Sequence, residues 1–410
     1  MASQIDIAQH RTRAPSLFAG LAVQPADALL ALIDLHRADP RADKIDLGVG
    51  VYRDESGATP IMRAVKRAER HLLETQASKS YLGADGDTRF TQLLAREVLG
   101  EALAASPRLT GVQTAGGTGA LRIGAELAQR AALTGGHSPR VWLGDPSWVN
   151  HAQIFAAAGL PVRKHRFYDA ATRTLDFDGM VDDLRHARAG DIVLLHGCCH
   201  NPTGVGFSAE QWRALTDLVT RRGLIPFIDM AYQGLGDGWD ADAAGARAML
   251  DAVDEAMLAY SCDKNFAFYR DRVGAFWLKS ARAEEVRIAH GNIVAIARCL
   301  WSMPPDHGAA TVRIVLDDPA LRADWQAELD HMRGRINQLR TLLAAAHPAL
   351  SPIGEQRGLF AMLPVSAQAV EMLRRDHGIY MASSGRINIA GLRTDQVPTL
   401  VEALRPHLPG

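Results

Sequence analysis

Lys264 is the residue of this chain with the clearest potential for amine and carbonyl chemistry. It closely follows an apolar segment at 256–260 that has the length of a buried strand. Burial lowers the pKa of a lysine and makes its amine a competent nucleophile toward aldehydes. A lone lysine at the end of a strand is more often a solvated surface residue, so its interpretation depends on the segments that accompany it.

Asp229 and Tyr232 follow a second apolar segment, at 224–228. A carboxylate and a phenol therefore emerge together at an edge of the expected sheet. A buried aspartate there needs a cationic partner, because an unpaired buried charge is costly. The alternative is that Asp229 caps the helix that follows.

Residues 114–120 form a glycine-rich turn that leads directly into a helical segment. Backbone amides of such a turn can approach a phosphate closely, and the helix N-terminus adds partial positive charge. The turn is neither a Walker loop nor a dinucleotide-binding GxGxxG motif, so a simple packing corner is the alternative.

A third segment, HGCCHNPTG at 196–204, brings two histidines and two cysteines together and invites a zinc interpretation. No second Cys/His pair stands at ligand spacing elsewhere in the sequence, and adjacent cysteines rarely chelate one ion. We expect no metal here.

Apolar segments of strand length alternate with longer segments of helical period, which predicts an α/β fold with a mostly parallel sheet. Buried parallel strands read as nearly continuous hydrophobic runs. The predicted strands are 140–144, 192–196, 225–229, 256–260 and 274–278. We predict helices at 120–133 and 209–222, the second capped by Ser208 with Gln211 three residues on.

The chain changes character from about residue 324. A helix at 325–346 is followed by strand-like pieces at 358–363 and 386–389 and by a helix near 394–404, which indicates a smaller α+β domain. We assign residues 1–58 to an N-terminal segment that joins the small domain, 59–325 to the large domain and 326–410 to the C-terminal small domain.

Bulk composition fits a globular protein with a large buried interior. The 410 residues are 47% hydrophobic with a formal net charge of −1, which leaves no global field for nucleic acid or an anionic membrane. The four cysteines do not form a disulfide framework, and no apolar run reaches membrane-spanning length. We expect a cytoplasmic protein with a frayed polar N-terminal tail.

Taken in order, the polar segments resemble the aspartate and aromatic aminotransferases, which are fold-type I enzymes dependent on pyridoxal-5′-phosphate (PLP). The resemblance runs from about Leu17 to the C-terminus. The motifs that carry it are GVGVYRD at 48–54, SYLGADG at 80–86, GGTGALR at 116–122, DPSWVNH at 145–151, HGCCHNPTG at 196–204, DMAYQG at 229–234, the Lys264 segment at 261–274, PPDHG at 304–308 and SGRIN at 384–388.

The resemblance implies a large domain with a mostly parallel seven-stranded sheet flanked by helices, and a catalytic site around Lys264. Lys264 would hold PLP as a Schiff base and then transfer the substrate's α-proton. Asp229 would pair with the pyridine nitrogen, supported by His196. Asn201 and Tyr232 would bond the phenolic oxygen of the cofactor, and Trp148 would stack on its ring.

The resemblance also assigns the remaining contacts of cofactor and substrate. Tyr81 would reach the phosphate from a neighbouring subunit, which implies a homodimer with shared active sites. Arg386 would grip the substrate α-carboxylate and Arg298 a side-chain carboxylate across the dimer interface. The remaining phosphate contacts would be Gly117, Thr118, Ser261 and Arg272, and the remaining substrate contacts Gly50, Trp148 and Asn201.

The chain departs from the family pattern at Asp263, where a second serine is usual. An anion beside a phosphate repels it, so we expect Asp263 to be turned away, to be compensated by Arg272 or another base, or to loosen cofactor binding.

A second departure is the apolar segment 299–303, where aspartate-specific members are polar. Arg53 and Thr59, however, resemble the pattern that favours dicarboxylates. We predict a dual enzyme that uses Arg298 for aspartate, glutamate and 2-oxoglutarate and moves it aside for aromatic side chains.

Three alternatives remain at this point. The chain could be a strictly aromatic aminotransferase, or a PLP lyase or decarboxylase with the same fold, but paired arginines suit an enzyme that admits an amino acid and an oxo acid in turn. A non-catalytic binding module would require the loss of Lys264, Asp229 or Arg386, and all three are present.

Overall fold

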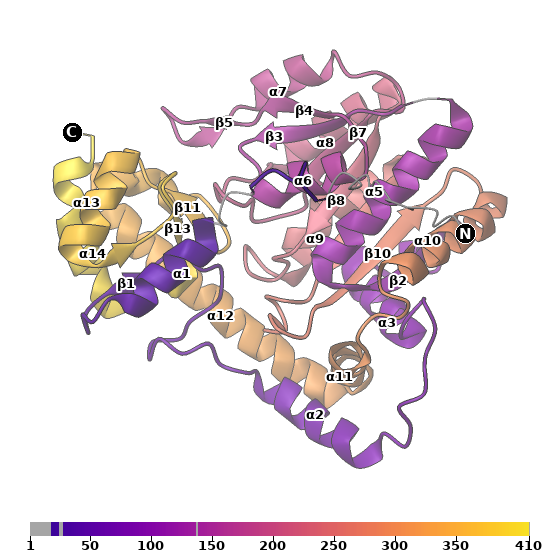
Figure 1. Cartoon of the computed structure of the whole chain (residues 1–410), viewed down its shortest axis with the longest axis horizontal. Coiled ribbons are helices and arrows are strands. Elements are labelled where there is room, and N and C mark those ends of the chain that lie inside the picture. The colour runs from indigo at the N-terminus through magenta and orange to yellow at the C-terminus, as the bar shows by residue number, and fades with distance from the viewer. Residues whose placement is uncertain (1–17, 24–27, 137, 410) are drawn as a thin grey trace, which may run out of the picture.

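The computed structural model describes residues 18–23, 28–136 and 138–409, so the N-terminal tail considered above lies outside the described residues. Its centre is a seven-stranded sheet in which only β10 runs antiparallel to its neighbours (Figure 1). This confirms the mostly parallel sheet predicted from the sequence. The strand order is β2 (Leu109–Ala115), β10 (Val273–Lys279), β9 (Ala256–Ser261), β8 (Ile225–Met230), β7 (Ile192–His196), β3 (Val141–Asp145) and β4 (Val162–Arg166).

Alternating side chains of the strands point into two cores, one on each face of the sheet. In β7, Ile192 and Leu194 enter one core, while Val193 and Leu195 enter the other. Because both faces are covered, the strand is apolar at nearly every position. The first core includes side chains from α5 (Gly116–Gly135), α6 (Val149–Ala157) and α10 (Ala283–Leu300), and the second from α3 (Thr88–Leu99), α7 (Phe177–Leu184), α8 (Ala209–Arg222) and α9 (Trp239–Ala252).

Helix α8 has the bounds and the cap that its sequence predicts. The Ser208 hydroxyl accepts from the backbone N–H of Gln211 at 3.1 Å, and the Gln211 side chain accepts from the backbone N–H of Ser208 at 2.8 Å. The helix ends at Gly223, whose φ of +62° suits a residue without a Cβ.

The C-terminal elements gather beside the sheet together with part of the N-terminal segment (Figure 1). The predicted strand pieces are β11 (Phe360–Met362) and β13 (Arg386–Asn388), which pair antiparallel. The N-terminal β1 (Ile45–Asp46) pairs with β12 (Ile379–Tyr380), far along the chain. The remaining helices of this region are α1 (Ala28–Ala38), α13 (Ala367–His377) and α14 (Val397–Leu404).

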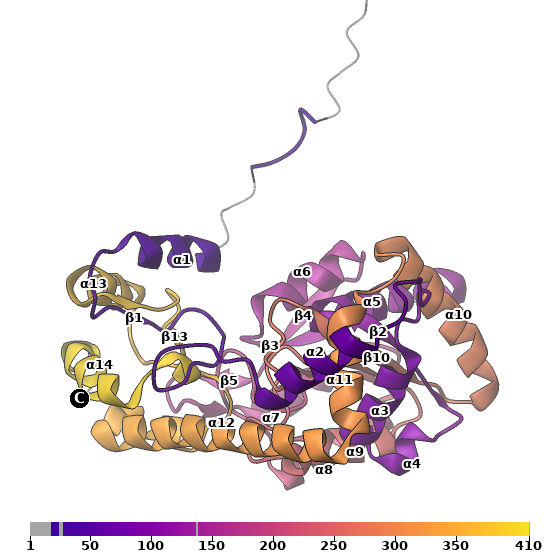
Figure 2. The same ribbon diagram turned by 90° about the horizontal axis from the view of Figure 1, so that it is seen from below.

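Helix α12 (Pro319–Ala346) connects this region to the body of the molecule. It runs along the lower side of Figure 2 and contacts α14 near one end and α2 (Arg63–Thr75) and α11 (Asp306–Asp317) near the other. The domain boundary predicted at residue 325 falls inside this helix, and the domain assignment stays a prediction. None of the helices in the described ranges combines the length and apolarity needed to cross a membrane.

The carboxyl ends of the parallel strands meet at one edge of the sheet. Strand β2 ends at the same edge, because β10 runs antiparallel to both β2 and β9. Open α/β sheets place ligands at this edge. The side chains of His196, Asp229 and Ser261, together with the first residues of α5, therefore come together there from distant parts of the sequence.

Candidate active site

A cavity of about 250 Å³ opens at this edge of the sheet and collects most of the residues predicted for the site. Strands β7, β8 and β9 contribute to its wall directly or through the loops that follow them, and β2 and β3 contribute through the residues after their ends. Its lining includes Gly117, Thr118, Trp148, His196, Asn201, Asp229, Tyr232, Ser261, Asp263, Lys264 and Arg272.

Asp229 lies near the end of β8, within the strand rather than past it, and is 7% exposed. It caps no helix, since α9 begins at Trp239 after Gly238, so that alternative is wrong. Its Oδ2 lies 3.0 Å from Nε2 of His151. Burial alone would raise the pKa of Asp229, but the hydrogen bond and charge of His151 and the nearby Lys264 outweigh it, and the pKa is lowered.

His151 is the functional residue that our sequence reasoning missed. It is fully buried, and its Nδ1 lies 2.9 Å from the Ser147 hydroxyl. When Nδ1 accepts from the Ser147 hydroxyl, the N–H of Nε2 is aimed at Asp229. Its motif, DPSWVNH, was among those that carry the family resemblance, but the sequence alone did not link residue 151 to residue 229.

His196 lies beside this pair without a hydrogen bond of its own. Its ring packs against His151 with the centroids 5.1 Å apart, and its Nε2 is buried without a partner among the described residues. Burial and the neighbouring His151 lower the pKa of His196 to about 3. The residue is therefore neutral near pH 7, and the direct partner of Asp229 is His151.

Lys264 projects into the cavity from the loop after β9. Its Nζ lies 5.3 Å from the centre of the Tyr232 ring. Desolvation lowers the pKa of Lys264, opposed by the carboxylates of Asp263 and Asp229. The lysine is thus shifted toward the neutral, nucleophilic amine, as the sequence led us to expect.

Tyr232 and Asn201 lie together on the wall that faces the C-terminal region. The Asn201 amide is 3.5 Å from the Tyr232 hydroxyl, and both side chains are buried. Burial, and then the charge of Asp229, raise the pKa of Tyr232, so its hydroxyl keeps its proton. Trp148 stands opposite as the N-cap residue of α6, with its ring edge-on to His151 at 5.1 Å.

The first turn of α5 and the end of β9 form the other end of the cavity. Gly116 starts the helix with φ of +70°, and a Cβ there would lie 2.6 Å from Nη2 of Arg272. A Cβ on Gly117 would lie 3.0 Å from the Cβ of Ser261. Only glycine permits this close packing, which leaves amides of a helix N-terminus facing an arginine and a serine.

Asp263 is compensated by Arg272, one of the three outcomes expected from the sequence. Oδ2 of Asp263 forms an ion pair with Nη1 of Arg272, and Oδ1 is buried without a partner in the described part of the chain. Asp263 lines the cavity and is 4% exposed, so it is not turned away.

Arg386 belongs to β13, outside the cavity lining but close to Tyr232. Its guanidinium lies 4.8 Å from the centre of the Phe360 ring, which itself packs edge-on against Tyr232 with centroids 6.0 Å apart. Nη2 of Arg386 donates to the Gly48 carbonyl at 2.9 Å. Gly50 packs on the same ring, because a Cβ there would lie 2.6 Å from Cζ of Phe360.

Two further predicted residues, Arg298 and Tyr81, also lie outside the cavity lining. Arg298 is exposed in the last turn of α10 and makes no ion pair with the described residues. Tyr81 is 92% exposed. Arg53, which resembles the pattern that favours dicarboxylates, is also outside the lining, and its Nη2 forms an ion pair with Oδ2 of Asp46 at 2.5 Å.

Comparison with known proteins places the chain in a family. The family model described as aminotransferase class I and II matches residues 42–404. The chain belongs to this family. It is 50% identical over 382 residues to the tyrosine aminotransferase of Rhizobium meliloti (strain 1021), which covers 92% of this chain and 97% of the relative.

Other relatives and solved structures agree. The chain is 43% identical over 398 residues to the aspartate aminotransferase of Escherichia coli (strain K12), covering 95% of this chain and 99% of the relative. The aromatic-amino-acid aminotransferase from Burkholderia pseudomallei, described as covalently bound to pyridoxal phosphate, superposes with a TM-score of 0.92 at 38% identity, covering 96% of this chain and 100% of that one. The chain is therefore a transaminating enzyme with the fold-type I architecture.

Proposed function

We propose that this aminotransferase uses PLP to exchange amino groups between L-amino acids and 2-oxo acids by a ping-pong mechanism. The amino acids are aspartate, glutamate and the aromatic amino acids, and the oxo acids are 2-oxoglutarate and oxaloacetate. One observation carries the proposal: Lys264, Asp229, Tyr232, Asn201 and Arg272 line a single cavity, although they come from separate segments of the chain.

The residues present fit PLP at both ends. The glycines at the start of α5, with Thr118, Ser261 and Arg272, supply amides, hydroxyls and a cation for a phosphate. At the other end, Asp229 keeps Oδ1 free of hydrogen bonds from the described residues while His151 holds Oδ2. When bound, PLP supplies an electron sink that stabilises negative charge at the substrate α-carbon.

The chain's own residues account for binding and proton transfer. Lys264 would hold the cofactor through a covalent bond and, as a free amine, would carry the proton to and from the substrate α-carbon. Its lowered pKa keeps a fraction of the amine neutral for both tasks. Asp229, whose Oδ2 is held by His151, would pair with the protonated pyridine nitrogen of the cofactor, and Tyr232 and Asn201 would donate to its phenolic oxygen.

Arginines orient the substrates. Arg386 has a buried Nε without a partner in the described part of the chain, and burial lowers the pKa of the side chain. Such a guanidinium suits a bidentate pair with an α-carboxylate. Arg298 binds the side-chain carboxylate of dicarboxylic substrates. We place it, with Tyr81, in the active site of a neighbouring subunit, so the enzyme is a homodimer, and we assign it to the cytoplasm.

The range of amino acids that the enzyme accepts distinguishes a dual aspartate and aromatic aminotransferase from a strictly aromatic aminotransferase. The segment after Arg298 is apolar, and Leu82 contacts Met303 beside the exposed Tyr81, with the backbone N–H of Leu82 3.1 Å from Sδ of Met303. An apolar rim accommodates aromatic side chains, while Arg298 serves carboxylates. Relatives named for tyrosine, aromatic amino acids and aspartate support both capacities.

The test compares kcat/KM for aspartate, phenylalanine and tyrosine with 2-oxoglutarate, for the wild type and for Arg298→Met. We expect turnover of all three, and a loss of about 100-fold for aspartate alone in the variant, since charge-assisted hydrogen bonds are worth about 1.5–3 kcal/mol each. If aspartate turnover were undetectable, the enzyme would be a strictly aromatic aminotransferase. If turnover of phenylalanine and tyrosine were undetectable, the dual assignment would be rejected. Release of carbon dioxide from the substrate would indicate a decarboxylase.

A further inference from the structure

Asp263 places a buried carboxylate in the cavity wall, at the end where the phosphate is proposed to bind. It stands immediately before Lys264 in the loop after β9. Its backbone N–H donates to the Ser261 hydroxyl at 3.2 Å, which fixes the start of this loop to the strand end. The carboxylate therefore belongs to the phosphate end of the cavity and cannot be treated as a surface charge.

Arg272 serves as the cation for this carboxylate and for the proposed phosphate at once. Nη1 bonds Asp263 and the Tyr269 carbonyl, while Nη2 packs on Gly116 at the start of α5. The guanidinium thus lies between the carboxylate and the helix N-terminus. The carboxylate of Asp263 already neutralises the single positive charge of Arg272, so Arg272 brings no excess positive charge to a bound phosphate.

The other titratable groups around Asp263 supply no second fixed cation. The Cys262 thiol and the Tyr269 phenol are both neutral near pH 7, because burial and the charge of Asp263 raise the pKa of each. The Tyr269 hydroxyl also accepts a hydrogen bond from the backbone of Tyr52 at 2.9 Å. Lys264 is cationic when protonated, but the proposed function commits it to the covalent bond with the cofactor.

A phosphate monoester carries a charge of about −1.5 to −2 at pH 7, with a second pKa of about 6. Beside a buried carboxylate, the second negative charge is disfavoured. One proton would remove it and would also give Oδ1 of Asp263 the hydrogen-bond donor that the described residues do not provide. Asparagine or serine at this position would impose no such requirement.

We propose that Asp263 couples cofactor binding to the uptake of one proton, which the phosphate and the Asp263 carboxylate share. This inference rests on the proposed function. Its consequence is a cofactor that binds more weakly as the pH rises above the second pKa of the phosphate. The fraction of enzyme that holds the cofactor then depends on pH through protonation at the phosphate, in addition to any pH dependence of the covalent bond to Lys264.

Calorimetry with pyridoxamine 5′-phosphate tests the coupling, since this ligand has no aldehyde to react with a lysine. Every form titrated, including the one with wild-type Asp263, also carries Lys264→Ala, which removes the ammonium group whose pKa Asp263 raises. Titrations at pH 8 in two buffers of different ionisation enthalpy count the protons taken up. We expect about one more proton for the wild type than for Asp263→Asn or Asp263→Ser, and binding about 10- to 100-fold tighter in the variants, because pH 8 is about two units above the phosphate pKa. Asp271→Asn, whose carboxylate is outside the cavity lining, is the matched control and should behave as wild type.

Phosphorus NMR of the wild-type complex gives an answer that does not depend on a variant folding. The ³¹P chemical shift should be that of a protonated phosphate at pH 8, and that of a dianion in Asp263→Asn. Equal proton counts in wild type and variants, or a dianionic shift in the wild type, would overturn the inference while leaving the proposed function intact. Failure of every form to bind the ligand would count against the proposed function itself.

Discussion

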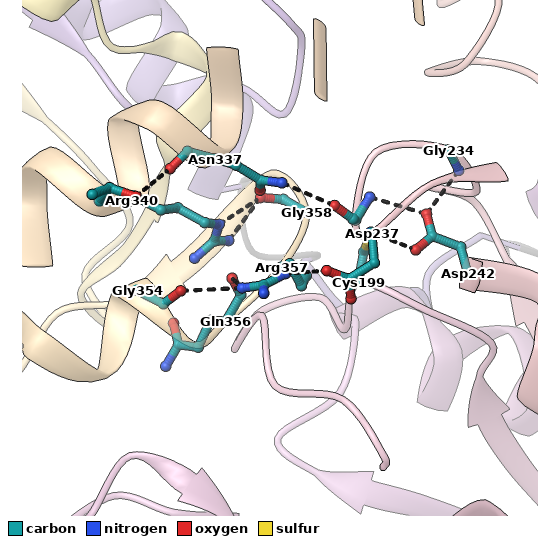
Figure 3. A network of polar contacts seen from close by, with 12 residues as sticks. Cys199, Gly234, Asp237, Asp242, Asn337, Arg340, Gly354, Gln356, Arg357 and Gly358 are labelled. Carbon is teal, nitrogen blue, oxygen red and sulfur yellow. Dashed lines mark hydrogen bonds and ion pairs between the residues drawn. The ribbon is translucent and has the colours of Figure 1, made fainter. Parts of the chain in front are cut away.

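Two buried polar regions of this enzyme differ in how completely their charges are satisfied. One is the cavity around Lys264. The other, shown in Figure 3, we call the Asp242–Arg340 network; it joins the loop after β8 to α12 and to the segment before β11, and comprises Asp237, Asp242, Asn337, Arg340 and Arg357. Both regions bury carboxylates and cations.

The charged groups at the centre of the Asp242–Arg340 network have all their partners. Asp242 accepts from three backbone N–H groups, at 2.8 to 3.0 Å. Arg340, which is 1% exposed, donates from all three side-chain nitrogens to the carbonyls of Ile353, Gly358 and Phe360. Only two neutral amide oxygens, those of Asn337 and Gln356, lack partners there among the described residues.

The cavity, by contrast, leaves chemically active atoms unpaired. Nε2 of His196, Oδ1 of Asp263 and Nε of Arg386 are buried without a partner in the described ranges. An unpaired buried polar group costs free energy, so its persistence calls for an explanation such as a missing ligand or a catalytic role. Of these two regions, only the cavity has charged side chains with buried atoms that lack a partner among the described residues.

The sharpest test of this contrast compares two lysines whose pKa values are lowered by desolvation. Lys264→Ala should lower kcat by at least about 10⁴-fold, since acid–base catalysis alone contributes about 10²–10⁴-fold and the covalent bond to PLP is lost as well. Lys279, on β10, donates to the carbonyls of Leu250, Asp251 and Val253, so Lys279→Ala should reduce stability and keep kcat. Single-turnover rates and urea unfolding measure the two effects; a Lys264 variant with near wild-type kcat would break the contrast.

The two buried aspartates provide the next comparison. Asp229→Asn should reduce kcat by about 10²–10³-fold, the usual cost of removing one preorganised electrostatic group. Asp242→Asn should instead lower the free energy of unfolding by about 1–3 kcal/mol, because backbone donors lose a charged acceptor. If Asp229→Asn destabilised the protein and left kcat unchanged, its carboxylate would be structural.

Arginines sharpen the contrast further. Arg386→Met should raise KM for every amino acid, with a loss in kcat/KM of about 100-fold, because charge-assisted hydrogen bonds contribute about 1.5–3 kcal/mol each. Arg340→Met removes donors from buried carbonyls and should cost about 3 kcal/mol of stability with unchanged KM. Equal effects of both substitutions on KM would show that the two regions are not separable.

The smallest expected effect concerns pH. Because the pKa of His196 is about 3 in the folded protein and near 6.5 when unfolded, the unfolded chain binds the extra proton between these values. Stability is therefore lost as the pH falls from 6.5 toward 3, by about 2 kcal/mol at pH 5. Urea unfolding at pH 7.5 and pH 5 should show a smaller loss for His196→Asn; the same loss in variant and wild type would contradict the assignment.

The sequence predicted most of the sheet because its central strands are buried on both faces and read as unbroken apolar runs. Strands β2 and β4 escaped prediction because they lie at the two edges of the sheet, where β2 is only partly buried and β4 carries exposed Arg163 and Lys164. The lining of the cavity followed from family motifs. The His151–Asp229 pair could not be predicted from the motifs, because the hydrogen bond joins residues 78 positions apart in the sequence. The sequence also did not show which of the three expected arrangements Asp263 adopts.

The central claim is that Lys264 and the groups around it bind PLP and transfer an amino group. The most direct measurement is the absorbance spectrum of the purified enzyme with PLP, followed during addition of aspartate, then tyrosine, then 2-oxoglutarate, with Lys264→Ala and Lys279→Ala alongside. We predict a pH-dependent cofactor band in the wild type and in Lys279→Ala that either amino acid bleaches and 2-oxoglutarate restores. A spectrum that the amino acids leave unchanged, or one that Lys264→Ala reproduces in full, would contradict the account.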